Sequence, residues 1–153
     1  MQAYLSPMIK LEKGMELLHA TGEKDQAVIL EKKSNTPLDA KKIHAFQGPE
    51  FRNLDVSQQR EISQQTFQVS NLNNRMAYQL LPTISPFEKS QLTGPVLPGT
   101  VQITPAGNLM VLMREAQTTG GYPRILQLTA ESINALAQLK TGDTFRIKIL
   151  PLN

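Results

Sequence analysis

The sequence predicts a mainly β protein, either a barrel or a sandwich, with one or two short helices. Short apolar runs separated by turn residues recur from residue 43 to residue 150, which is typical of all-β folds. The chain contains ten prolines and nine glycines, most of them between these runs, and only two segments have a helical pattern. Strands therefore dominate, without the regular alternation of strands and longer helices that indicates a parallel sheet.

Composition limits the classes of protein to which the chain can belong. Its 153 residues suffice for one domain, and 40% hydrophobic with 19% charged residues fits a globular protein. No apolar run approaches the ~18 residues that span a bilayer. The net charge of +3 is spread without a basic, aromatic-rich stripe, so neither a membrane nor nucleic acid is an expected partner. The absence of cysteine excludes disulfides and thiol nucleophiles and is compatible with the expected cytoplasmic location.

The first half of the chain contains two predicted strands and a predicted helix. Residues 26–31 form a short apolar run suited to a strand, and residues 43–46 alternate in polarity before a Gly-Pro pair. Residues 57–65 are polar and rich in glutamine, and we expect a short surface helix capped near Asp55 or Ser57.

A pair of strands and a hairpin follow. Residues 66–69 and 76–80 are strand-like and are joined by an asparagine-rich loop. Residues 82–99 contain four prolines and two glycines, which excludes a helix and predicts a long ordered loop or a linker. Residues 100–104 and 109–114 form the clearest hairpin, because Pro-Ala-Gly-Asn between them supplies a proline for the first corner and a glycine for positive φ.

The C-terminal part predicts a strand, a helix and a final strand. Residues 124–128 form an apolar run. Thr129 is a suitable cap for a helix over residues 130–139, and Gly142 would end it. Residues 144–150 alternate apolar with charged side chains, which predicts a strand with one face in solvent.

The segment Gln117–Pro123 is the most informative loop. It packs an amide, two hydroxyls, two adjacent glycines, a phenol and a proline into seven positions. Gly120 and Gly121 are able to take positive φ or to let a ligand or another backbone come close, and Pro123 restricts the conformation of the preceding residue. This composition fits a rigid binding loop, and it also fits a tight connection whose polar groups bond their own backbone.

Several ordered blocks carry a family resemblance. They are Ser70–Leu80, Pro98–Ala116, Gln117–Pro123 and Ala137–Asp143. Together they resemble the C-terminal portion of the KipA family, which includes allophanate hydrolase subunit 2, biotin-dependent carboxyltransferase-like proteins and a 5-oxoprolinase subunit. The resemblance is good over residues 43–149 and implies a cyclophilin-like β-barrel.

This sequence departs from the family pattern at informative positions. Glu115 replaces an aspartate before the loop, while Ala77 and Gln79 replace a glycine and an arginine. The amino-terminal block of the family is absent. The resemblance therefore implies that residues 1–42 are the remnant of a preceding segment with the first strands. Residues 43–153 would be the C-terminal barrel domain of a longer protein.

The resemblance implies a subunit of an ATP-dependent 5-oxoprolinase. With a KipI-like partner subunit, such an enzyme opens the amide ring of 5-oxoproline, a small amide substrate, to give glutamate. The carboxyltransferase domain of a urea carboxylase or allophanate-type system, which uses biotin, is an alternative. A regulatory module that binds a KipI-like kinase inhibitor is another. Because the chain has no Gly-Lys-Ser/Thr phosphate loop, ATP would be bound in another way or by the partner.

Glu115 is the candidate catalytic residue, since the matching family position is an acid. Burial at a strand end would raise the pKa of a carboxylate toward the range useful for acid or base catalysis. The alternative is an exposed glutamate without a catalytic role. His19 and His44 have no ligand-spaced partners, so no metal site is expected.

The candidate substrate-binding residues surround the same loop. Hydroxyls and backbone amides of the loop could hold a carbonyl or phosphate oxygen, and its tyrosine could stack on a planar ligand or fill the barrel mouth. Arg75 could clamp an anion or simply order its own loop, and Gln102 would share a face with Thr100. The full set is Gln117, Thr118, Thr119, Gly120, Gly121, Tyr122, Arg75 and Gln102.

Overall fold

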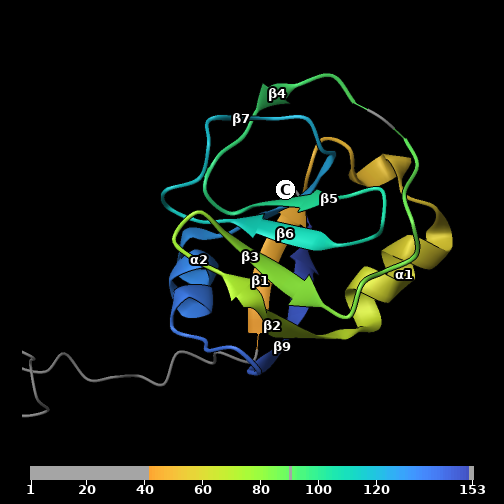
Figure 1. The fold of residues 1–153 in the computed structure, drawn as a ribbon. Helices are drawn as coiled ribbons and strands as arrows, with labels where there is room; N and C mark the ends of the chain where they lie inside the picture. The colour runs from red at the N-terminus through yellow and green to blue at the C-terminus, as the bar shows by residue number, and fades with distance from the viewer. Residues whose placement is uncertain (1–41, 90, 152–153) are drawn as a thin grey trace, which may run out of the picture. The chain divides into compact units, whose positions relative to one another are not determined.

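The computed structural model describes residues 42–89 and 91–151, in which seven strands form a closed barrel (Figure 1). Around the barrel the strands follow the order β1-β8-β5-β6-β3-β2-β9. The prediction of a mainly β barrel with one or two short helices is confirmed. The barrel strands are β1 (Lys42–Gln47), β2 (Thr66–Asn73), β3 (Ala77–Leu81), β5 (Thr100–Ile103), β6 (Leu109–Leu112), β8 (Arg124–Leu128) and β9 (Thr144–Leu150).

The first and last strands close the barrel. β1 and β9 pair in parallel, with Lys42 opposite Arg146 and His44 opposite Lys148, whereas the other neighbouring strands are antiparallel. Alternate side chains fill the interior, as the period of a strand requires. Phe67 and Phe145 face each other there with ring centroids 6.4 Å apart. The structure does not describe residues 1–41. The predicted strand at residues 26–31, the predicted preceding segment and His19 lie in this range.

Both predicted helices are present. α1 (Val56–Gln64) begins at Asp55, which forms a capping box with Gln58 and so satisfies two backbone donors of the first turn. α2 (Ala130–Ala137) begins at Thr129, whose hydroxyl accepts from the backbone of Ser132. A short 3₁₀ turn, η1 (Phe51–Asn53), was not predicted; it follows β1 and buries Phe51.

The β5–β6 hairpin has the predicted turn. Gly107 adopts φ +79°, where a side chain would be strained. The backbone N–H of Ile84 donates to the Gly107 carbonyl at 3.0 Å, so the proline-rich segment lies against this turn. Ile84 and Phe87 are both buried. Residues 82–89 and 91–99 therefore belong to an ordered loop that contributes to the core.

Two short strands form a separate sheet that the sequence did not predict. β4 (Gly94–Pro95) pairs with β7 (Thr119–Gly120), and the Val96 backbone donates to the Thr118 carbonyl at 2.9 Å. We call residues 92–98 and 117–122 the flap. In Figure 1, the β4 and β7 labels lie at the top of the view, above β5. The flap thus brings the Gln117–Pro123 loop into contact with the proline-rich segment.

Candidate functional site

The flap covers the outer face of β5. Thr100 and Gln102 point to that face, yet they are 4% and 2% exposed. The Gln102 side-chain amide donates to the Tyr122 carbonyl at 3.0 Å, and Val96 is buried beside it. Gln102 therefore joins the barrel to the predicted loop. Its side-chain N–H is used in this structural hydrogen bond.

Of the two roles expected for the paired glycines, positive φ and close approach of another group, the structure shows only the second, and only at Gly120. Neither Gly120 nor Gly121 has positive φ; among the described residues only Gly99, Gly107 and Gly142 do. A Cβ on Gly120 would lie 2.6 Å from the side-chain nitrogen of Gln102. The close approach of the Gln102 side chain thus explains why a glycine stands at position 120. A Cβ on Gly121 would meet only the Thr93 hydroxyl, at 3.6 Å, so packing does not explain the second.

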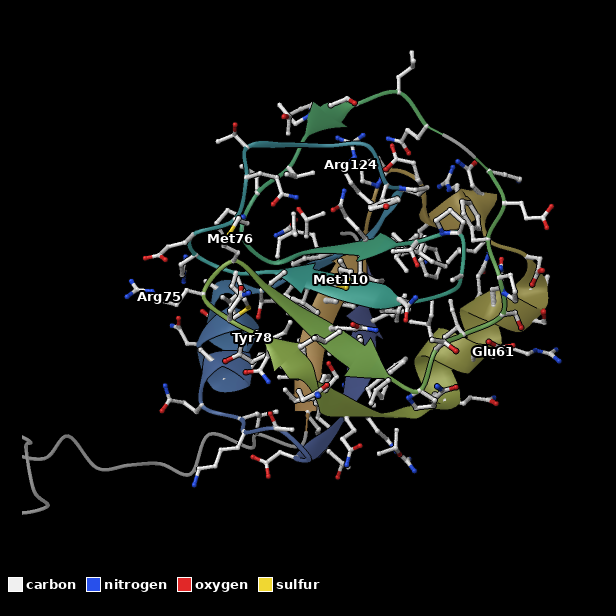
Figure 2. The ribbon with its side chains drawn as sticks, in the orientation of Figure 1. Glu61, Arg75, Met76, Tyr78, Met110 and Arg124 are labelled. Atoms are coloured by element: carbon white, nitrogen blue, oxygen red, sulfur yellow. The ribbon has the colours of Figure 1, made fainter. Side chains whose placement is uncertain are left out.

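Glu115 and Arg75 lie together at the surface. The Arg75 guanidinium is 2.5 Å from the Glu115 carboxylate, with side chains 83% and 52% exposed, and the Glu115 backbone donates to the Arg75 carbonyl at 3.0 Å. Figure 2 shows Arg75 at the edge of the barrel, pointing outward. Of the two alternatives for Glu115, buried or exposed, the structure shows the exposed one, because the chain leaves the core after Met113. The two predicted residues nevertheless form one polar pair.

A second ion pair, between Glu50 and Arg124, did not emerge from the sequence. Two guanidinium nitrogens of Arg124 contact the two carboxylate oxygens of Glu50 at 3.0 and 2.7 Å, and the side chains are 21% and 14% exposed. The Arg124 backbone donates to the same carboxylate at 2.9 Å, and a third guanidinium nitrogen donates to the Pro95 carbonyl at 2.9 Å. This pair ties η1, β8 and the flap together.

A hollow of about 140 Å³ lies beside this ion pair. Its polar side chains already bond one another: the Thr100 hydroxyl donates to Gln127 at 2.9 Å, and the Gln127 amide donates to the Pro98 carbonyl at 2.8 Å. Its lining consists of Pro49, Pro95, Leu97, Thr100, Arg124, Leu126 and Gln127.

The predicted site residues thus separate into three groups. Glu115 and Arg75 form an exposed pair where β6 continues into the loop, while Gln102 lies buried under Gly120. Tyr122 is 47% exposed on the flap. The remaining predicted residues, Gln117, Thr118, Thr119 and Gly121, are exposed on the flap. The polar groups available to a ligand therefore lie on the outside of the flap and next to the Arg75–Glu115 pair.

Residues 5–149 match the family described as the carboxyltransferase domain, subdomain A and B. The chain belongs to this carboxyltransferase-domain family. It is 38% identical over 103 residues to a 5-oxoprolinase subunit of Escherichia coli, a match that spans 66% of this chain and 33% of that protein. It is 37% identical over 84 residues to the 5-oxoprolinase subunit of the same name in Haemophilus influenzae, over 52% of this chain and 26% of that protein. The chain spans a third or less of the length of these relatives.

A solved structure supports the same fold. Kluyveromyces lactis urea carboxylase superimposes with a TM-score of 0.63 at 18% identity, over 73% of this chain and 11% of that protein. At this identity the likeness shows that the carboxyltransferase-domain fold is shared. Within residues 42–89 and 91–151, no helix is long and apolar enough to cross a bilayer.

The charge of Glu50 makes the stability of this carboxyltransferase-family domain depend on pH. Hydrogen bonds from the Arg124 side chain are the main cause that lowers the pKa of Glu50, and they outweigh its partial burial. A lowered pKa in the folded state gives stability that is present above the unfolded value, about 4.3, and is lost as pH falls through the folded value. Glu50→Gln should therefore be less stable than wild type at pH 7.

Below about pH 4.3 the difference in unfolding free energy between Glu50→Gln and wild type should shrink. Urea denaturation at pH 7, 5, 4 and 3 measures it. Glu115→Gln is the matched control, since it breaks an exposed pair that is worth little. A gap between wild type and Glu50→Gln that stays constant across this range would contradict the assigned role of Glu50.

Proposed function

We propose that this chain supplies the flap and barrel of a 5-oxoprolinase subunit. With ATP and a KipI-like partner subunit, the assembly would open the amide ring of 5-oxoproline to give glutamate. The observation that carries the proposal is the 38% identity over 103 residues to a protein named as a 5-oxoprolinase subunit. The reaction needs hydrogen-bond donors to the amide oxygen and a group that accepts and returns a proton.

The exposed polar residues of the loop are suited to these two roles. Thr118 and Thr119 carry hydroxyls on the outside of the flap, where they would donate to the amide carbonyl of the substrate. The Glu115 carboxylate, held by Arg75 at 2.5 Å, would accept or return the proton. Arg75 is 83% exposed and would also pair with the carboxylate of 5-oxoproline. ATP would be bound by the partner or at a contact with it.

The test is turnover by the complete assembly. The full gene product that contains this chain, together with its KipI-like partner, should consume 5-oxoproline only when ATP is present and should release glutamate. Folding is checked by circular dichroism and complex formation by size-exclusion chromatography. A folded, assembled complex that releases no glutamate would reject the proposal.

Gly121 allows the loop to be tested without disturbing the fold. Because a Cβ there meets only the Thr93 hydroxyl at 3.6 Å and φ is not positive, Gly121→Ala should change the unfolding free energy by less than about 1 kcal/mol. If a substrate approaches the loop closely, the same variant should lower kcat/KM by about tenfold or more, which corresponds to ~1.4 kcal/mol. Glutamate release and urea denaturation measure the two effects. An unchanged kcat/KM in Gly121→Ala would show that the substrate does not approach this loop.

The family itself supports a carboxyltransferase as a second candidate function. The match to a carboxyltransferase domain over residues 5–149 favours transfer of a carboxyl group from carboxybiotin to a small acceptor such as urea. In that case biotin would be the cofactor and would be carried by another domain or subunit. Carboxylation of urea by the biotin-loaded assembly, without glutamate release from 5-oxoproline, would favour this candidate.

Exposed apolar side chains on the flap favour a third candidate, a protein-binding role. Leu92 is 90% exposed, Leu97 66% and Tyr122 47%. Such residues are suited to bury themselves against a protein, as a module that sequesters a KipI-like kinase inhibitor would require. Tight binding of a KipI-like protein that Leu92→Asp weakens, without any turnover of 5-oxoproline, would favour this role.

A further inference from the structure

The Gln102 side chain contacts the Gln117–Pro123 loop at two of its residues. Its amide nitrogen donates to the Tyr122 carbonyl at 3.0 Å. The same nitrogen would lie 2.6 Å from a Cβ on Gly120, which would also be 3.3 Å from Val96. The hydrogen bond opposes movement of the loop away from the barrel, and the close contact prevents movement toward it. This one side chain therefore fixes the distance between the loop and β5.

A β-bulge lies next to this contact. The pairing of β5 with β8 shifts by one residue at Gln102, so that Ile125 is an extra residue of β8. Bulges redirect the side chains around them and occur often beside active sites. Immediately after the shift, the Ile103 backbone donates to the Pro123 carbonyl at 3.1 Å. The bulge thus brings the end of the loop against β5, where Gln102 reaches it.

The two segments of the flap are held by different side chains. Arg124 and Gln127 each donate to a backbone carbonyl of residues 92–98, at 2.9 and 2.8 Å. Gln102 holds residues 117–122 instead. This second segment carries both candidate hydroxyl donors. Loss of the Gln102 donor would therefore release the segment that matters for the substrate and leave the side-chain contacts to the first segment in place.

We propose that Gln102 is a positioning residue of the substrate loop, an inference that rests on the proposed function. Gln102 is 2% exposed, so it acts through the loop backbone and not by contact with the substrate. It holds Thr118 and Thr119, which are exposed, at the place where their hydroxyls meet the amide oxygen. Precise placement matters, because a displacement of about 1 Å can cost on the order of 100-fold in rate.

Gln102→Met in the full gene product, assembled with its KipI-like partner and ATP, tests the proposal. Methionine keeps the length of the side chain and removes its donor. We expect kcat/KM for 5-oxoproline to fall at least tenfold, with a raised KM. A loss of folded enzyme alone would lower kcat and leave KM unchanged. Gln102→Asn, whose amide is one methylene too short, should act alike, and it replaces Gln102→Met if a melting curve shows that the methionine variant does not fold.

Hydrogen exchange measures the position of the loop without any reaction. The Val96 backbone donates to the Thr118 carbonyl at 2.9 Å, so its amide exchanges when the two segments of the flap separate. In Gln102→Met this amide should exchange at least tenfold faster than in wild type. The amides of β6 in the barrel should keep their wild-type rates.

Gln58→Met is the matched control. Gln58 is the other buried glutamine of the described residues, at 4% exposure. Its side-chain amide donates to the carbonyls of Ser85 and Pro86 at 3.2 and 2.8 Å, outside the flap. The variant should lose stability, but its KM for 5-oxoproline should stay within twofold of wild type. Exchange at the Val96 amide should also stay within twofold.

The outcomes separate this inference from the proposed function. A wild-type assembly that releases no glutamate rejects the reaction, and exchange at Val96 then still decides whether Gln102 holds the loop. An active wild type together with an unchanged kcat/KM in Gln102→Met would overturn the positioning role alone. Unchanged exchange at Val96 would overturn it as well, and so would equal changes in Gln102→Met and Gln58→Met.

Discussion

Arg124→Ala should lower the free energy of unfolding by about 3 kcal/mol, within the range found when one partner of a buried ion pair is removed. The substitution leaves the Glu50 carboxylate, whose side chain is 14% exposed, without its two guanidinium contacts. It also removes the donor to the Pro95 carbonyl, which belongs to the flap. Because solvent still reaches part of the pair, we expect the lower end of the range.

Urea denaturation at pH 7 measures the effect of Arg124→Ala. Arg75→Ala is the matched control, since its ion pair with Glu115 is exposed and should cost less than about 1 kcal/mol. Arg124→Lys should recover only part of the loss, because an ammonium cannot make the two-pronged contact. Faster proteolysis within residues 92–98 of Arg124→Ala would show that the flap loosens first. Equal losses in Arg124→Ala and Arg75→Ala would contradict the proposed role of Arg124.

Gly107→Ala should destabilise the protein by about 3 kcal/mol or more, for two physical reasons. The residue has φ +79°, and a non-glycine residue in an unfavourable backbone region costs on the order of 1–3 kcal/mol. In addition, its Cβ would overlap the carbonyl oxygen of Ile84. Relief of that overlap would displace the turn that accepts from the Ile84 backbone at 3.0 Å.

Gly142→Ala separates these two reasons. Gly142 also has positive φ, +93°, but its Cβ would meet only the Gln68 side-chain nitrogen, at 4.0 Å. It should therefore cost about 1 kcal/mol from backbone strain alone. Thermal and urea unfolding of the two variants under identical conditions give the comparison. If both variants lose the same stability, the contact between Gly107 and Ile84 is not what makes glycine necessary there.

Local sequence patterns determined much of the barrel. The alternating residues 144–150 form β9 with Phe145 and Ile147 buried, and the Pro-Ala-Gly-Asn turn places Gly107 at positive φ. Thr129 caps α2 as predicted. The helix ends at Ala137, two residues before the predicted end, and Leu139 instead donates to the Leu136 carbonyl in a tighter turn. Caps, turns and periodicity depend on a few neighbouring residues, so they can be predicted from the sequence.

The sequence also indicated part of the candidate site. The ordered motifs from Ser70 to Asp143 pointed to the family that the comparison shows, and the structure places the predicted residues Arg75 and Glu115 in direct contact. The sequence left open whether Glu115 would be buried or exposed, and the structure shows that it is exposed. Nor did the sequence indicate that Gly120 would be required by Gln102, because the exposure of one residue depends on what a distant segment covers.

Tertiary structure alone decided the Glu50–Arg124 pair, the flap and the closure of the barrel. Glu50 and Arg124 are 74 residues apart, and nothing in the neighbouring sequence of either one indicates the other. β4 pairs with β7 and β1 pairs with β9, and each pairing joins segments that are far apart in the sequence. Closure is a property of the whole set of strands, whose register sets Lys42 opposite Arg146. The sequence by itself determined which segments form the strands of the barrel, and their closure decided which polar groups meet.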